Sequence, residues 1–152
     1  MKLVMPVMSV YLRRGIEYVE ITPNDDECGG RCMATSIIID EYGDPLFWWK
    51  IDREAMIFIT GHIARVRLKK EKYRDWQKHG AEQDIKYIVD IAFKLCGGIE
   101  DTNKYIEVLW QKVSDILSTP LAQRQIEAVA NALCIKRRLS GRAVRQIMKA
   151  VE

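Results

Sequence analysis

Apolar residues recur at steps of three and four along most of the chain after Asp52, and this period places side chains on one face of an α-helix. The clearest stripe follows Gly80 and is ended by Gly97 and Gly98. It consists of Ile85, Ile88, Val89, Ala92, Leu95 and Cys96. Similar stripes predict helices around residues 53–70, 105–116, 126–133 and 140–151, with Asp52 and Ser140 as the N-caps of the first and last. A chain with this pattern is expected to fold around a mostly helical core.

The first forty residues have a different pattern. Residues 16–21 (IEYVEI) and 33–40 (MATSIIID) are rich in β-branched and aromatic residues and predict two strands. The polar, glycine-bearing loop between them predicts an antiparallel hairpin, or two edges of a small sheet. Before it, residues 3–12 predict a buried helix that begins near Pro6, ends at Gly15 and carries Val7, Val10 and Tyr11 on its inner side. The expected fold is α+β and predominantly α-helical, a small N-terminal β-hairpin packed on a helical bundle, in a single domain over residues 1–152.

Neither a membrane nor an oxidising compartment is indicated. The apolar run at residues 3–12 is far shorter than the roughly 20 residues that span a bilayer, and no small-x-small cleavage site follows it. Of the four cysteines, Cys96 and Cys134 occupy apolar helical positions, where cysteine behaves as a small hydrophobic residue. No disulfide framework is suggested, so a reducing, cytoplasmic location is expected.

Motifs for catalysis or metal binding are scarce. The chain holds only two histidines, His62 and His79, and it has no glycine-rich phosphate loop and no Gly-x-Ser-x-Gly elbow. His62 is expected to be a partly buried, hydrogen-bonded side chain and His79 to be solvated. Cys28 and Cys32 are separated by three residues on the predicted hairpin loop, whereas a structural zinc site needs four ligands. Two unpaired thiols beside a glycine-rich turn are therefore the favoured interpretation.

Two surface features leave alternatives open. The net charge of +3 is too small to indicate a nucleic-acid partner by itself. Basic residues do cluster near the C-terminus, but an apolar stripe on the same helix favours an ordinary solvated face over a nucleic-acid surface; they are Lys136, Arg137, Arg138, Arg142, Arg145 and Lys149. The run Phe47-Trp48-Trp49 is consistent with core or with a partner surface, and core is the favoured interpretation.

Several stretches, taken in order, resemble the peptidase domain of FtsH-type ATP-dependent zinc metalloproteases, and more closely the small stand-alone bacterial proteins related to that domain. The similarity covers essentially the whole chain, in short pieces. These are VMSVYL (residues 7–12), GIEYVEITP (15–23), TGHIA (60–64), GAEQD (80–84) and the tail LSGRAVRQI (139–147).

The resemblance implies a zinc site that this chain lacks in part. In the family a His-Glu-x-x-His helix leads directly into the stretch that matches residues 7–12, whereas here Met1-Lys2-Leu3-Val4-Met5 stands before it. The aspartate of the Gly-Ala-x-x-Asp motif supplies the third zinc ligand in the family, and Asp84 occupies that position. One carboxylate cannot form a zinc site. Without the family pattern, Glu82 and Asp84 are simply carboxylates at a helix start.

We therefore expect a peptidase-like domain without peptidase activity and without a bound cofactor, which acts as a protein-binding or regulatory module. One alternative is an active zinc metallopeptidase whose missing ligands come from sequence upstream of Met1 or from another chain. A further alternative is a helical nucleic-acid-binding protein that uses the basic C-terminal helix. The chain has no Walker lysine motif, so ATP-driven unfolding would need a partner.

Overall fold

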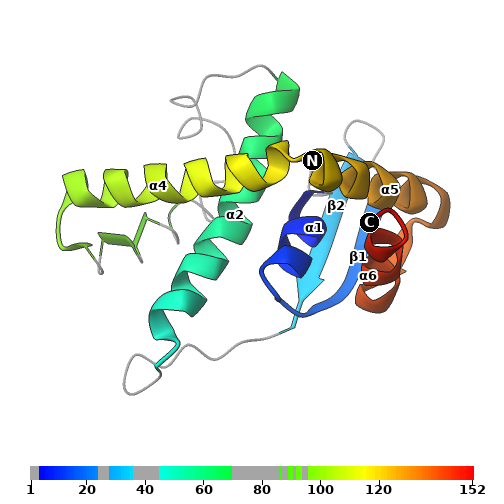
Figure 1. Ribbon diagram of the computed structural model, residues 1–152, viewed down its shortest axis with the longest axis horizontal. Coiled ribbons are helices and arrows are strands. Elements are labelled where there is room, and N and C mark those ends of the chain that lie inside the picture. Colours follow the sequence, from blue (N-terminus) through cyan, green and yellow to red (C-terminus); the bar gives the residue numbers. More distant parts are fainter. Residues whose placement is uncertain are drawn as a thin grey trace. The chain divides into compact units, whose positions relative to one another are not determined.

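The structure is a computed structural model that describes residues 4–23, 28–35, 45–69, 86, 89–90, 92–93 and 96–152. Within these residues the chain forms five helices and one three-stranded antiparallel sheet, so the prediction of a mostly helical α+β fold is confirmed (Figure 1). The chain divides into two compact units. The sheet unit combines Met1–Ile37 with Ile116–Glu152, and the helical unit is Ile38–Asp115.

Helix α1 (Val4–Tyr11) opens the sheet unit and buries Pro6, Val7, Met8 and Ser9. Tyr11, which was predicted to face inward, is 38% exposed, and its hydroxyl donates a hydrogen bond of 2.7 Å to the Gln125 side chain. Gly15 does not end the helix as predicted, because Arg13 already adopts a left-handed φ of 54°. Gly15 serves close packing instead, since a Cβ there would lie 2.5 Å from Thr35 Oγ1.

The sheet has the order β2-β1-β3, and β1 (Ile16–Pro23) pairs antiparallel with both neighbours. The predicted first strand and the antiparallel hairpin are confirmed. The second strand, β2 (Cys28–Ala34), begins earlier than predicted, so Cys28 and Cys32 lie in a strand and not in a loop. Pairing with β1, as at Val19–Cys32, satisfies the backbone hydrogen bonds of this glycine-rich segment. The segment is therefore a strand although its side chains have little strand propensity. Residues 36–40 of the predicted strand lie outside the described residues.

The third strand, β3 (Arg138–Ser140), was not predicted. It is only three residues long, and its single apolar residue, Leu139, is buried between two exposed neighbours and pairs with Val19. So short a segment carries no recognisable alternation, because one apolar residue cannot define a period.

Helices α5 (Pro120–Lys136) and α6 (Gly141–Lys149) cover the sheet and complete its core. Ser140 is the N-cap of α6, as predicted, and its hydroxyl accepts a hydrogen bond of 3.2 Å from the Ala143 amide. The buried cluster draws on every helix and on two strands of this unit; its members are Val7, Ile16, Val19, Val129, Leu133, Leu139, Val144 and Met148.

The helical unit contains α2 (Phe47–Lys69) and most of α4 (Ile99–Ser118). Helix α2 starts five residues before Asp52, so the prediction that Asp52 is its N-cap is wrong. Ile59 and Ile63 are buried as the stripe predicts, and α4 buries Ile106, Leu109, Val113 and Leu117. The described residues between 86 and 96 are helical, and Gly97, with a φ of +73°, ends this segment as predicted. None of the helices in the described ranges has the length and apolarity that crossing a bilayer requires.

Candidate functional site

The start of α2 carries an aromatic patch, which consists of Leu46, Trp48 and Trp49. Their exposed fractions are 54%, 60% and 45%. The prediction that the tryptophans belong to the core is therefore wrong. A signal was present in the sequence, because three consecutive large aromatic residues on a helix point in directions about 100° apart and cannot all face one core.

The backbone and one ring contact hold this patch in place. The Lys50 amide donates a hydrogen bond of 2.9 Å to the Leu46 carbonyl, so the turn before α2 is continuous with the helix. The half-buried Phe47 ring meets Trp48 edge to face, with ring centroids 5.4 Å apart and an interplanar angle of 77°. This arrangement is one that aromatic pairs prefer. Trp48 is therefore exposed but braced on one side.

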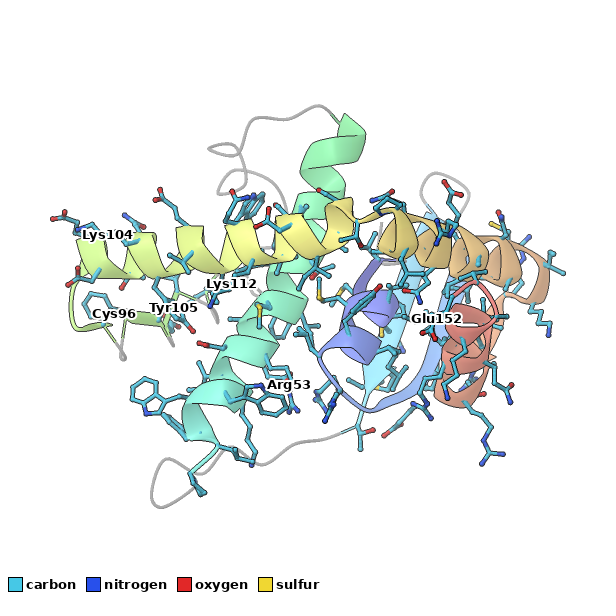
Figure 2. The ribbon with its side chains drawn as sticks, viewed as in Figure 1. Arg53, Cys96, Lys104, Tyr105, Lys112 and Glu152 are labelled. Carbon is cyan, nitrogen blue, oxygen red and sulfur yellow. The ribbon has the colours of Figure 1, made fainter. Side chains whose placement is uncertain are left out.

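Arg53 lies one helical turn after Trp49 and is only 7% exposed. Its guanidinium carbon lies 4.5 Å from the centroid of the Trp49 ring, and its Nε lies 3.4 Å from Glu54 Oε1 (Figure 2). A shielded cation over a tryptophan is stabilised by about 1–2 kcal/mol. The guanidinium thus supports the indole ring from beneath and leaves part of the ring accessible to a partner.

Next to Arg53 in the sequence, Asp52 makes a polar contact that joins α2 to α4. The Tyr105 hydroxyl donates a short hydrogen bond to the Asp52 carboxylate. Burial, the hydrogen bond to Asp52 and the charge of Asp52 all raise the pKa of Tyr105, and Cys96 adds to the effect. The phenol therefore remains a neutral donor at ordinary pH. It fixes the second turn of α2 onto α4 within the helical unit.

The exposed part of this site is mostly apolar, because its accessible groups are two indole rings and one aliphatic side chain. Arg53 is paired with Glu54, and the Asp52 carboxylate accepts a hydrogen bond from the neutral Tyr105 hydroxyl. Within the ranges that the structure describes, no group of three or more His, Cys, Asp or Glu residues could hold a metal ion.

The residues singled out from the sequence are scattered. Asp84, the position of the family's third zinc ligand, lies outside the described residues, as do Glu82 and His79. His62 is in α2 and 6% exposed, in agreement with the expected buried side chain. Cys32 is a half-buried free thiol whose pKa is raised to about 11 by burial, against an opposing effect of Arg14. A thiol with that pKa is protonated at neutral pH.

Helix α1 contains most of the stretch at residues 7–12 and reads VMPVMSVY. It carries no imidazole and no carboxylate, so α1 itself offers no zinc ligand.

The six basic residues near the C-terminus, from Lys136 to Lys149, are all exposed. This agrees with the solvated face expected from the sequence. These basic residues belong to the sheet unit, whereas the aromatic patch belongs to the helical unit.

No protein-family model matches the sequence, and no curated protein matches it significantly.

Proposed function

We propose that this chain is a non-catalytic relative of the FtsH-type peptidase domain and works as a protein-binding module, with the aromatic patch as its contact surface. The observation that carries the proposal is the exposure of Trp48 and Trp49 above the shielded Arg53. The resemblance of the sequence motifs, in their order along the chain, supports the scaffold.

A protein partner suits this surface better than a small molecule does. Tryptophan and arginine are the residue types that contribute most to protein–protein binding, and they do so where neighbouring groups hold them rigid. Trp49 is held by Arg53, and Trp48 is braced by Phe47. Exposed indole rings are costly in water, so a surface that displays two of them is stabilised when a partner covers it.

The proposed lack of catalysis rests on the side chains that would bind zinc. Zinc hydrolysis in this family needs two imidazoles and a glutamate on the helix before the residue 7–12 stretch. Val4 and Met5 stand there, preceded by Met1, Lys2 and Leu3. A scaffold that keeps its fold after losing these groups can still present a binding surface.

The binding proposal is tested by photo-crosslinking in the cells from which the protein comes. The full-length chain carries a photoreactive phenylalanine analogue at position 48, or at Val108 as a control in the same unit, where the native side chain is 53% exposed. We expect one discrete crosslinked protein from position 48, lost when Trp49→Ser is added, and none from position 108. Equal crosslinking from the two positions would contradict the proposal.

The absence of peptidase activity is tested separately, by zinc analysis and casein hydrolysis with the purified protein. We expect no stoichiometric zinc and no hydrolysis. Zinc at one equivalent per chain, abolished by Asp84→Ala, would instead support the active alternative with ligands from elsewhere.

A further inference from the structure

The positive charge of this protein is concentrated in one segment. The chain has 24 basic and 21 acidic residues, and residues 128–151 contain six of the basic residues and no acidic residue. The remainder of the chain is therefore net acidic, with 18 basic residues against the same 21 acidic ones. A surface of one sign on an otherwise acidic molecule indicates a partner of the opposite sign.

Helix α6 arranges three of these cations in a row. One side of the helix is packed into the core through Val144 and Met148, which are 0% and 3% exposed, and Arg142, Arg145 and Lys149 are exposed. At 100° and 1.5 Å per residue, the three cations fall within an arc of about 60° and span about 10 Å. We name them the α6 cationic row.

We propose that the α6 cationic row binds the phosphate backbone of a nucleic acid. This goes beyond the proposed function, because the row lies in the sheet unit and the aromatic patch in the helical unit. A span of about 10 Å corresponds to the axial rise of about three nucleotides in one strand of B-DNA. Two of the three side chains are arginines, whose planar guanidinium groups match phosphate oxygens in a bidentate geometry.

The neighbouring charged groups define the limits of the row. Arg138 is not part of it, because its guanidinium stacks on the Tyr18 ring at 3.9 Å and Glu20 faces it across the strand pair. Glu152 follows the C-terminal end of the helix, where its amide donates to the Lys149 carbonyl at 3.4 Å. Lys136 and Arg137 at the end of α5 are exposed and add to the positive potential.

Nucleic acid fits better than the other anionic macromolecules. A membrane-surface helix inserts large apolar side chains next to its basic residues, whereas here Val144 and Met148 are buried in the core. An acidic peptide would gain affinity from an apolar anchor beside the cations. The large apolar side chain that is exposed in this segment, Ile135, is on α5 and not on α6. Nucleic-acid binding needs only the cations, since phosphate contacts supply essentially all of the non-specific affinity.

The test is fluorescence anisotropy with the full-length protein and labelled probes, one a DNA duplex of about 20 base pairs and one a single-stranded RNA of similar length, titrated between about 50 and 200 mM salt. The variant is Arg142→Gln/Arg145→Gln/Lys149→Gln. The control, Lys104→Gln/Lys112→Gln/Arg124→Gln, removes three exposed cations from α4 and α5 and changes the net charge equally.

We expect the wild-type protein to bind at least one probe at low salt. The slope of log affinity against log salt is negative. The row variant should reduce its magnitude by about 2–3, and the control should reduce it by less than one. Circular dichroism shows whether the triple variant is folded. If it is not, the three single variants are measured, each with an expected decrease of about one.

Three results would overturn the inference. One is the absence of binding to both probes at the lowest salt concentration. Another is an equal loss in the row variant and the control. The third is competition by polyglutamate, or by vesicles containing phosphatidylserine, that is as effective as competition by unlabelled nucleic acid.

Discussion

Helix α6 of the sheet unit and the start of α2 in the helical unit differ in which side chains they bury and which they expose. In the sheet unit, α6 buries Val144 and Met148 and exposes its cations. At the start of α2, Trp48 and Trp49 are exposed, and the cation, Arg53, is shielded. The first distribution is the one that folding alone requires. The inverted distribution leaves apolar surface in water, and it is the observation on which the proposed binding function rests.

The most direct test of this difference is to truncate one large side chain in the sheet unit core and one at the start of α2. Leu133→Ala in the sheet unit core should lower the free energy of unfolding by about 3–4 kcal/mol, because Leu133 is fully buried. Trp48→Ala should lower it by only about 1 kcal/mol, because the indole is 60% exposed and loses mainly its edge-to-face contact with Phe47. Urea denaturation followed by circular dichroism measures both, and a comparable loss from the two variants would mean that Trp48 serves the fold.

The packing of the sheet unit is tested more finely at Gly141. A Cβ on this residue would lie 1.9 Å from the Ile16 carbonyl oxygen, which is backbone and cannot turn aside. Gly141→Ala should therefore destabilise the protein by about 2–3 kcal/mol, despite the better helix propensity of alanine. Gly98→Ala is the control, because a Cβ there meets nothing within 4 Å. Equal denaturation midpoints for the two variants would refute this account of the contact.

Helices were predictable from this sequence where one face is apolar over several turns. The periodic stripes predicted over residues 126–133 and 140–151 correspond to α5 and α6. Turn chemistry was equally informative at Ser140, which caps α6 with its side chain. These features depend on residues close together in sequence, so local pattern suffices to find them.

Features that depend on distant partners were missed. Strand β3 exists because Leu139 pairs with Val19, and the Cys28–Ala34 segment is a strand because β1 lies beside it. Neither segment has a strand pattern of its own. The exposure of the aromatic patch was missed for a different reason, because the expectation that large apolar residues are buried does not hold for Trp48 and Trp49.

The pH dependence of stability tests how far the core of the sheet unit buries Cys32 in β2. The pKa of the Cys32 thiol is raised from 9.0 to about 11 by burial. The neutral thiol is thus favoured in the folded state, and its contribution to stability is complete below about pH 9 and lost as the pH rises toward 11. Between pH 8 and 10.5 the wild-type protein should lose about 1–2 kcal/mol more than Cys32→Ser does.

Cys134, which is exposed, provides the control for this measurement. Denaturant titrations of Cys134→Ser at the same pH values should parallel those of the wild-type protein. If Cys32→Ser also parallels the wild type, the thiol is solvated and the core does not extend to β2.

The smallest expected effect concerns Arg137, the C-cap of α5. Its φ of 62° is left-handed, and its amide donates a hydrogen bond of 2.8 Å to the Leu133 carbonyl. Arg137→Gly should raise the free energy of unfolding by about 1 kcal/mol, because glycine adopts this conformation without a penalty. Arg137→Ala removes the same charge and keeps the penalty, so it should show no such gain. A gain from alanine in thermal denaturation would attribute the effect to charge repulsion instead of backbone strain.

The position of β1 between β2 and β3 has a consequence for how the protein is made. Tyr18 in β1 pairs with Ser140 in β3. The Tyr11 hydroxyl donates a hydrogen bond to Gln125, which is 114 residues further along the chain. On a ribosome, the N-terminal hairpin is complete long before the strand and helices that cover it are synthesised. Such non-local contacts make folding slow, and the uncovered edge and apolar face of β1 are prone to aggregation until translation ends. Fast translation of the middle of the chain, or a chaperone bound to the hairpin, would therefore favour the yield of native protein.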